Sequence, residues 1–370
     1  METTVKKTGA LSKFLDRHFP PPHVLFPASV GIDISDASVK WLRLSQESRG
    51  GIRVHSFGSE MLKEGAVMRG IIRNPAFLTE ALAIVRKKAG TAYAHAALPE
   101  EIAFVFPMHV PVKTDRVQAR KLVEFELEGR VPIPAAEAVF DFTIVDDHDE
   151  LGEEIGVELF KADHVQAYID VFLAAGLVPM SFEVEAHSVA RAVTSRTDPV
   201  TLIVDCGYAR TGFAVVKYGV PIFTSTADTG GANFQSALKE RGGVPDDQAL
   251  AYMKEFGLVS SGTNAAAALS IQPVANAIKD EILRHFQYWD SQRNNKGERS
   301  TPVERVVLVG GTANLRGFAD LVSGAVHREA EIGNIWRNLF SFNEYIPPIA
   351  RQESVQYATA LGLAMRSVTP

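Results

Sequence analysis

Residues 200–217, VTLIVDCGYARTGFAVVK, contain the pattern that decides the fold. The segment begins as a continuous apolar run, which is typical of a strand buried on both faces. Asp205 follows at the end of that run, Gly207 comes two residues later, and the chain then becomes apolar again, as in a tight hairpin. Backbone N–H groups at such a turn can approach an anion, and the neighbouring carboxylate can hold a metal ion through water. By itself, the segment is equally consistent with an ordinary hairpin that has a polar tip.

A second segment near the N-terminus repeats this arrangement. Residues 29–45, SVGIDISDASVKWLRLS, contain an apolar strand that ends in Asp33, a polar turn and an alternating second strand. A glycine pair then precedes a third strand over residues 52–57. In the same way, a glycine turn separates residues 201–217 from a third strand over 220–226. We interpret this repetition as an internal duplication of a three-stranded meander, with each copy leading into a helix.

A third glycine turn lies late in the chain. Residues 305–318, RVVLVGGTANLRGF, read as a buried strand that runs into Gly310-Gly311 and then a helix. Such a turn lets a flat base or a ribose lie against the backbone, and facing hairpins present N–H groups and carboxylates to a polyphosphate. Because Mg²⁺ keeps most of its waters, Asp33 and Asp205 suffice to hold it through water. The three turns together predict a nucleotide cleft.

Composition bounds the class of protein. With 370 residues, 46% of them hydrophobic, the chain can bury a large core and form two or three domains. A net charge of -6 argues against a nucleic-acid-binding surface. No apolar run approaches the roughly 20 residues that span a bilayer, and no signal core is visible. We therefore expect a soluble intracellular protein without direct membrane insertion, and the single Cys206 excludes an internal disulfide.

Changes in composition suggest where the domains divide. Asn74 and Gly90 predict the ends of a helix over residues 75–89. The segments between about residues 100 and 185 read as a compact β–α–β–β–α unit, whose last helix we expect to be capped by Asp163. A long helix is expected to start at Pro273. The expected parts are a leader over 1–27 with one short docking helix, a first domain over 28–99 and 186–200, a small inserted α+β subdomain over 100–185, and a second domain over 201–370.

These motifs resemble the actin-like ATPase superfamily that includes Hsp70, sugar kinases and FtsA. The matching segments are residues 31–34 (GIDI) with 38–40 (SVK) for the first phosphate loop, 205–211 (DCGYART) for the second, and 310–313 (GGTA) for the adenosine motif. More narrowly, the chain is similar to the PilM family of type IV pilus assembly proteins over roughly residues 28–367. The segments that carry this likeness are 124–142, 174–186, 227–231 and 357–364. The resemblance implies an α/β, actin-like (ribonuclease H-like) duplicated fold with two nucleotide-cleft domains and a small inserted α+β subdomain.

The resemblance also implies ATP and Mg²⁺ as cofactors. Asp33 and Asp205 would be the carboxylates that hold Mg²⁺ through water, and Glu185 would position the attacking water as the catalytic residue. The other implied nucleotide contacts are Gly31, Ser35, Lys40, Gly207, Arg210, Thr211, Gly230, Gly231, Gly310, Gly311 and Thr312. Two of these residues have structural alternatives. Lys40 could simply extend from an apolar strand towards solvent, and Glu185 could be a carboxylate stabilised by a helix N-terminus.

The first phosphate loop departs from the family pattern. Where the family has Gly-Ser, this chain has Ser35-Asp36. The loss of the glycine restricts the approach of the backbone, and Asp36 would repel phosphates if it pointed at them. Arg210 on the facing hairpin could offset that charge, although the sequence does not say whether the two residues meet. We therefore expect slow or no ATP hydrolysis, and at most a weak ATPase.

The resemblance implies a cytoplasmic ATP-binding scaffold of a type IV pilus or a related secretion or competence machine, peripheral to the inner membrane through protein partners. Its partners would be other pilus components and the N-terminal peptide of a PilN-like bitopic membrane protein. That peptide would lie between the first domain and the insert and add to an edge strand. One alternative is an FtsA-like divisome or filament protein, although no amphipathic membrane helix follows Met365. Another is a small-molecule kinase, but residues 58–113 offer no Asp as a general base.

Overall fold

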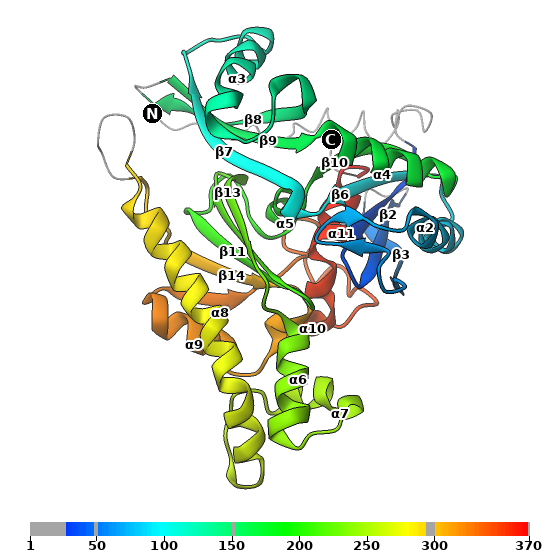
Figure 1. Ribbon diagram of the computed structural model, residues 1–370, viewed down its shortest axis with the longest axis vertical. Helices are drawn as coiled ribbons and strands as arrows, with labels where there is room; N and C mark the ends of the chain where they lie inside the picture. The colour runs from blue at the N-terminus through cyan, green and yellow to red at the C-terminus, as the bar shows by residue number, and fades with distance from the viewer. Residues whose placement is uncertain (1–26, 48–50, 150–151, 294–299, 369–370) are drawn as a thin grey trace.

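The computed structural model describes residues 27–47, 51–149, 152–293 and 300–368. The short helix expected within the leader therefore lies outside the described residues. The described strands form two five-stranded sheets, one three-stranded sheet and one two-stranded ribbon. Figure 1 shows the three-stranded sheet at the top, one five-stranded sheet below it, and the other at the right.

The first sheet has the strand order β10-β6-β1-β2-β3. Its strands are β1 (Ser29–Ile34), β2 (Ser38–Gln46), β3 (Ile52–Met61), β6 (Tyr93–Leu98) and β10 (Val178–Val184), and the ribbon consists of β4 (Val67–Met68) and β5 (Ile71–Ile72). β1 pairs antiparallel with β2 and parallel with β6, which pairs parallel with β10. The carboxyl ends of β1, β6 and β10 therefore meet at one edge of the sheet, where open α/β sheets bind ligands.

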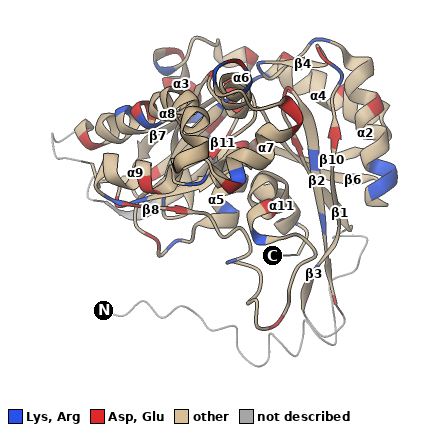
Figure 2. Ribbon diagram, turned by 90° about the horizontal axis from the view of Figure 1, so that it is seen from below, with Lys and Arg blue, Asp and Glu red and all other residues tan. Residues whose placement is uncertain are grey.

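Local signals set the ends of α2 (Pro75–Ala89) as the sequence predicts. The Asn74 side chain accepts a hydrogen bond from the Phe77 N–H at 3.3 Å, and Gly90 ends the helix in the left-handed conformation, with φ 67°. Basic residues in the last turn, visible in blue in Figure 2, complement the negative end of the helix dipole. The buried face of α2 packs against the first sheet.

The second sheet has the order β13-β12-β11-β14-β15. Its strands are β11 (Thr201–Cys206), β12 (Thr211–Lys217), β13 (Val220–Ala227), β14 (Arg305–Val309) and β15 (Glu329–Ile332). The antiparallel run β11-β12-β13 repeats β1-β2-β3. This topology confirms the predicted duplication of the meander.

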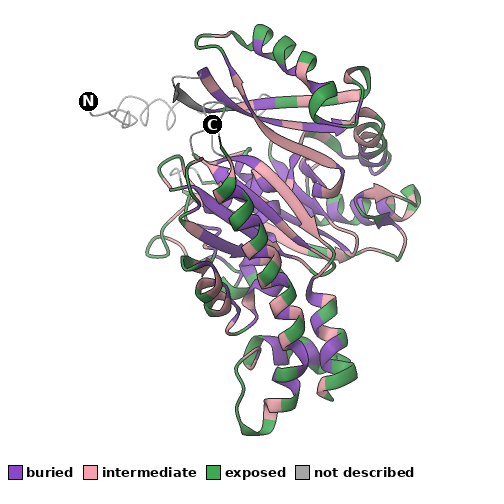
Figure 3. Ribbon diagram, turned by 60° about the vertical axis from the view of Figure 1, so that its left-hand side comes forward, coloured by how far each residue is buried: buried purple, intermediate pink, exposed green. Residues whose placement is uncertain are grey.

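Helices α6 (Gly231–Gly242), α7 (Asp246–Glu255), α8 (Ala265–Ser291), α9 (Phe318–Val326) and α10 (Arg351–Ser354) belong to the second half of the chain. The expectation that the long helix starts at Pro273 is wrong, because α8 begins at Ala265 and carries that proline inside. The alanine-rich segment before the proline strongly favours helix, which offsets the backbone donor that the proline removes and the clash of its ring with the preceding turn. Figure 3 shows that α8 buries one side and leaves the other exposed.

The insert is a small sheet covered by one helix. Its elements are β7 (Ala103–Val110), α3 (Arg116–Arg130), β8 (Ala138–Asp149) and β9 (Gly152–Lys161), with strand order β7-β9-β8. It has a hydrophobic core of its own, in which Val123 and Leu127 of α3 pack on Val157 of β9. Lys217 of β12 reaches Glu154 of β9 at 2.6 Å, which ties the insert to the second sheet.

The sheets place the end of the insert earlier than the expected residue 185. The helix α4 (Ala162–Ala174) packs against α2, and β10 pairs with β6, so both belong with the first sheet. The expected cap is also different: Asp163 lies inside the first turn of α4, which follows Lys161. The expected boundary was too late because α4 connects the insert to β10, and β10 pairs in parallel with the distant strand β6. A parallel pairing between distant strands leaves no local signal in the sequence.

The closing helix α11 (Ala358–Met365) also packs on the first sheet, although we expected it within the second domain. All of its residues are buried, and it lies against β1 and α5 (Glu185–Val193). Two glycines permit this approach. A Cβ on Gly31 would lie 2.1 Å from the carbonyl oxygen of Ala360, and one on Gly362 would lie 1.8 Å from that of Ser188. Helix and strand therefore touch through their backbones.

Candidate functional site

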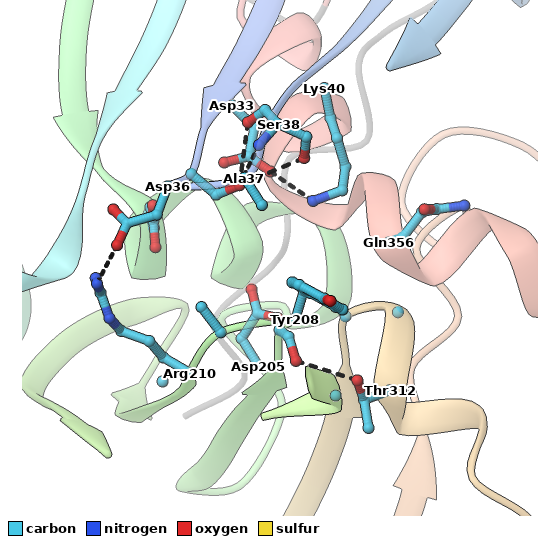
Figure 4. A pocket seen from close by; sticks show the side chains of 18 of the residues that line it. Asp33, Asp36, Ala37, Ser38, Lys40, Asp205, Tyr208, Arg210, Thr312 and Gln356 are labelled. Carbon is cyan, nitrogen blue, oxygen red and sulfur yellow. Dashed lines mark hydrogen bonds and ion pairs between the residues drawn. The ribbon is translucent and has the colours of Figure 1, made fainter. Parts of the chain in front are cut away.

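A cavity of about 640 Å³ lies between the two meanders, a size suited to a small-molecule ligand. It is lined by the tips of both hairpins, the start of α5 and the turn that follows β14. Figure 4 shows Asp33, Lys40 and Asp36 on the first hairpin facing Asp205, Tyr208 and Arg210 on the second. The duplicated units thus bring their polar turns to one place.

Four of the carboxyl groups that line this cavity are placed there by the ends of strands. Asp33 lies at the end of β1, Glu100 follows β6, and Glu185 follows β10 as the first residue of α5. These three strands are parallel neighbours, so the three side chains share one sheet edge. Asp205 on β11 lines the cavity from the other sheet.

Lys40 is the cation nearest to this cluster in the described residues. Its Nζ lies 3.8 Å from Oδ2 of Asp33, its cross-strand neighbour. Lys40 lines the cavity, so its charge faces the cleft. Burial raises the pKa of Asp33, and the charge of Lys40 partly opposes that effect.

Asp205 and Glu185 form no ion pair within the described part of the chain, although the charge of Lys40 also lowers the pKa of both. Burial raises the pKa of Asp205 to about 6, with a further contribution from the charge of Asp33. Burial, followed by the charges of Asp33, Glu100 and Asp205, raises the pKa of Glu185 well above its usual range. The cavity is lined by seven carboxyl groups and by three cationic side chains, Lys40, Arg210 and Lys254, so a bound cation would be stabilised there.

The second hairpin is packed against two glycine turns. The Thr312 hydroxyl donates to the carbonyl of Gly207 at 3.1 Å, and a Cβ on Gly231 would lie 2.6 Å from that hydroxyl oxygen. Gly310 has φ 85°, and a Cβ there would lie 2.3 Å from Oδ1 of Asp205. These positions require glycine, and they hold bare backbone beside the carboxylate.

Not all the residues that the sequence analysis named line the cavity. Those that do are Asp33, Ser35, Lys40, Glu185, Asp205, Gly207, Arg210, Gly231, Gly310, Gly311 and Thr312. Gly31 instead packs under α11. Thr211 is fully buried and donates to the carbonyl of Thr229 at 2.7 Å, and a Cβ on Gly230 would meet the backbone of Tyr208 at 2.6 Å. These three residues pack behind the turns and do not line the cavity.

Asp36 and Arg210 meet across the cleft. The carboxylate of Asp36 forms an ion pair with Arg210 and accepts the backbone N–H of Arg69 at 3.0 Å and that of Gly70 at 3.4 Å. Arg210 also pairs with Glu101, which follows Glu100. The charge that the sequence analysis treated as a source of repulsion is therefore neutralised from the facing hairpin.

Glu100 and Glu101 also line the cavity, although no sequence motif singled them out. They directly follow a strand and Pro99, and that position was a usable signal, but nothing local indicated that β6 lies beside β1. Gln352, Glu353 and Gln356 line the cavity beyond Gly310-Gly311, and they too were not predicted from the sequence.

No group of three or more His, Cys, Asp or Glu side chains is arranged to bind a metal ion within the described residues. Contact through water, as Mg²⁺ commonly makes, remains compatible with the carboxylates present. Among the same residues, no helix is long and apolar enough to cross a bilayer.

The chain matches the family model described as type IV pilus assembly protein PilM over residues 31–368. A solved PilM-PilN type IV pilus biogenesis complex is similar at 22% identity and TM-score 0.75, covering 93% of this chain and 100% of that chain. The ethanolamine utilization protein EutJ from Carboxydothermus hydrogenoformans is 19% identical, with TM-score 0.52 and coverages of 93% and 90%. MreB5 of Spiroplasma citri bound to ADP is 10% identical, with TM-score 0.51 and coverages of 91% and 94%. A search of the curated proteins finds no match.

At these identities the solved structures establish the fold alone. They confirm the expected actin-like α/β fold, in which two related sheets flank a cleft. The family match covers nearly the whole chain, including the insert.

Proposed function

Because the chain belongs to the family of the type IV pilus assembly protein PilM, we propose that it is a Mg²⁺-ATP-binding scaffold of a type IV pilus or a related secretion or competence machine. The observation that carries nucleotide binding is the cavity between the duplicated hairpins, with Asp33 and Asp205 on opposite walls. Actin-like relatives such as the MreB5 structure bound to ADP are consistent with this use of the fold.

The residues present fit a hydrated Mg²⁺. Asp33 and Asp205 would hold it through water, and their raised pKa values indicate buried carboxyl groups that a cation would compensate. Bound there, Mg²⁺ would supply the positive charge that lets a polyphosphate enter an acidic cavity. Lys40 and the backbone N–H groups of the second turn would contact the phosphates.

The other end of the cavity suits a nucleoside. Gly310 and Gly311 supply backbone without side chains, and Thr312 and Gln356 line the same end of the cavity (Figure 4). A base and ribose could lie flat against this turn. The glycine requirement at Gly310 follows from its φ of 85° and supports a role for close backbone approach.

Hydrolysis would be slow. A carboxyl group that orients or deprotonates water must be ionised, and burial raises the pKa of Glu185 well above its usual range. Ionisation of Glu185 therefore depends on the cation. Arg210, which could otherwise stabilise charge on the phosphates, is paired with Asp36 and Glu101. We infer that occupancy of the cleft, rather than rapid turnover, is the useful state.

The proposed partner is the N-terminal peptide of a PilN-like inner-membrane protein. β10 is an edge strand of the first sheet, and its exposed Val178 and Met180 are 44% and 45% accessible. An extended peptide can add to such an edge, with its side chains in pockets beside it. The resulting protein would be cytoplasmic, held at the inner membrane by this peptide and by other pilus components.

The proposal is tested by measuring the binding of two ligands, Mg²⁺-ADP and a PilN-type peptide. The affinity of the purified protein for Mg²⁺-ADP is measured by calorimetry for the wild type and for Asp205→Asn, with Glu80→Gln as a control outside the cavity. The expected result is a large loss only in Asp205→Asn. A synthetic PilN-type N-terminal peptide is then titrated with and without nucleotide. Equal nucleotide affinity in all three proteins, or no peptide binding, would contradict the corresponding part of the proposal.

A further inference from the structure

A group of ion pairs joins the two halves of the molecule at one edge of the cavity. Arg210 of the second hairpin pairs with two acids of the first half, Asp36 in the turn between β1 and β2 and Glu101 in the short helical turn Glu100–Ile102. All three residues line the cavity, and Figure 4 shows Asp36 and Arg210 pointing toward one another across it. We call Asp36, Glu101 and Arg210 the clasp.

The clasp is largely withdrawn from water. The side chains of Arg210 and Glu101 are each 15% exposed, and that of Asp36 is 22% exposed. An ion pair that is shielded from solvent and salt contributes more than an exposed pair, and a guanidinium can bind two carboxylates through its fork of N–H donors. Arg69 and Asp228 also join the two halves, at 2.8 Å, but both side chains are mostly exposed, so their pair contributes less.

Glu101 connects the clasp to the insert. Its turn directly precedes β7, and the neighbouring Glu100 accepts the backbone N–H of Ala186 in α5 at 3.2 Å. The insert is joined in sequence to β6 and α4 of the first half, yet β7 lies against β13 of the second sheet. A Cβ on Gly156 of β9 would lie 2.9 Å from the carbonyl oxygen of Pro221 in β13. The turn Glu100–Ile102 is therefore a place where a movement of the first sheet against the insert would be absorbed.

The clasp and a nucleotide compete for the same cation. Phosphate oxygens carry the same sign of charge as Asp36 and Glu101, and a guanidinium binds phosphate and carboxylate in the same bidentate way. Arg210 gives up contact with the two acids when it turns towards a phosphate, and the acids then repel the phosphate. In the ligand-free protein the clasp therefore opposes the entry of a polyphosphate into the cavity.

We propose that the clasp is an autoinhibitory contact, which a bound polyphosphate releases by drawing Arg210 away from Asp36 and Glu101. Its release frees the turn Glu100–Ile102, so that the first sheet can move against the insert. This inference rests on the proposed nucleotide-binding function and adds to it the regulation of the same site. Occupancy of the cleft thereby changes the arrangement of the two parts between which the partner peptide is expected to lie.

The experiment compares the wild type with Glu101→Gln and Arg210→Gln, which keep a side chain of similar length without its charge. Asp246→Asn is the matched control, because Asp246 pairs with Lys239 within the second half and away from the cavity. Spin labels on Lys87→Cys in α2 and Glu128→Cys in α3 report the distance between the first domain and the insert. The native Cys206 is buried, so it does not compete for the label.

Double electron–electron resonance gives the distance distribution with and without Mg²⁺-ADP, calorimetry gives the affinity, and thermal unfolding verifies that each variant is folded. Without nucleotide, we expect Glu101→Gln and Arg210→Gln to broaden the distribution and Asp246→Asn to match the wild type. Mg²⁺-ADP should broaden the wild-type distribution in the same way. The affinities should change in opposite directions: Glu101→Gln binds about threefold more tightly because Arg210 is released, whereas Arg210→Gln binds more weakly because the cation is lost.

Two results overturn the inference while the proposed function stands. One is a folded Glu101→Gln variant that keeps either the distance distribution or the affinity of the wild type. The other is a wild type that binds Mg²⁺-ADP without any change in the distribution. If the wild type binds no nucleotide, the proposed function fails, and the inference fails with it even where the variants broaden the distribution.

Discussion

The hairpins β1–β2 and β11–β12 share one topology, but they treat their carboxylates differently. In the first hairpin Asp33 faces Lys40 across the strands, and the two charges lie 3.8 Å apart. In the second, Asp205 faces Gly212, which has no side chain. The first hairpin thus places a lysine directly opposite its acid, whereas the second places its acid opposite a glycine and beside bare backbone. A duplicated unit has kept its geometry while its chemistry has diverged.

The tips of the two hairpins carry side chains of opposite charge. In the first, Ser35 Oγ donates to the carbonyl of Ser38 at 3.0 Å, so the tip is closed by its own side chains. Asp36 is left to pair with Arg210 of the second tip. The acid of the first tip is therefore matched by a cation on the other copy. Two residues that look unrelated along the chain thus form one contact across the cleft.

The largest effect is expected from adding a methyl group at Gly31. Because its Cβ would lie 2.1 Å from the carbonyl oxygen of Ala360, α11 must move, and we expect Gly31→Ala to cost about 3 kcal/mol of stability. A Cβ on Gly212 of the other copy has only an ordinary contact at 3.8 Å, so Gly212→Ala should cost less than about 1 kcal/mol. Urea unfolding measures both. Equal losses would show that the two copies are not packed differently.

The next effect concerns the acid of the second hairpin. For Asp205, the folded-state pKa of about 6 exceeds the usual 3.8, so ionisation costs stability as pH rises from about 4 through 6. At pH 8 without cation, Asp205→Asn should therefore raise the stability of the ligand-free protein by about 2 kcal/mol. Asp33→Asn should stabilise less, because it leaves Lys40 unpaired. Calorimetry at pH 4 and pH 8 tests this, and a larger gain at pH 4 would contradict the sign.

A smaller effect is expected at the contact between the tips. Asp36→Asn removes a negative charge from the cleft and loosens Arg210, which can then turn towards phosphate. We expect Mg²⁺-ADP affinity to rise about threefold to tenfold, of the order of 1 kcal/mol. Asp228→Asn, at an exposed carboxylate 3.8 Å from Arg210, is the matched control and should change affinity less. Weaker nucleotide binding in Asp36→Asn would mean that the contact assists binding instead of competing with it.

The smallest effect on stability is expected at the contact between α5 and the insert. His187 of α5 pairs with Glu158 of β9; burial lowers the pKa of the imidazole, but the Glu158 charge and hydrogen bond outweigh burial and raise it overall. Because the folded-state pKa is raised, the stabilisation is present below about pH 6.5 and is lost as pH rises through the folded-state pKa. His187→Gln should therefore cost stability at pH 6, by less than about 1 kcal/mol, and cost less at pH 8.5. Thermal unfolding at both values provides the check.

Much of the local structure could be predicted because its causes are local. The caps Asn74 and Gly90 fixed α2 to the residue, and the alternation and glycine turns located both meanders. Asp33 and Asp205 could be recognised since each ends a strand within a repeated pattern. Strand periodicity and helix caps act over a few residues, so they can be read without knowing the fold.

The sequence by itself thus determined the duplication, the hairpins and the two acids at their ends. Only the tertiary structure decided that β10 and α11 join the first sheet, that Gly31 serves packing, and that Asp36 meets Arg210. It also decided that Glu100 lies in the cleft, because parallel strands far apart in the chain end at the same edge. Such pairings join distant residues through backbone hydrogen bonds and burial, and those interactions are not written in any short stretch of sequence.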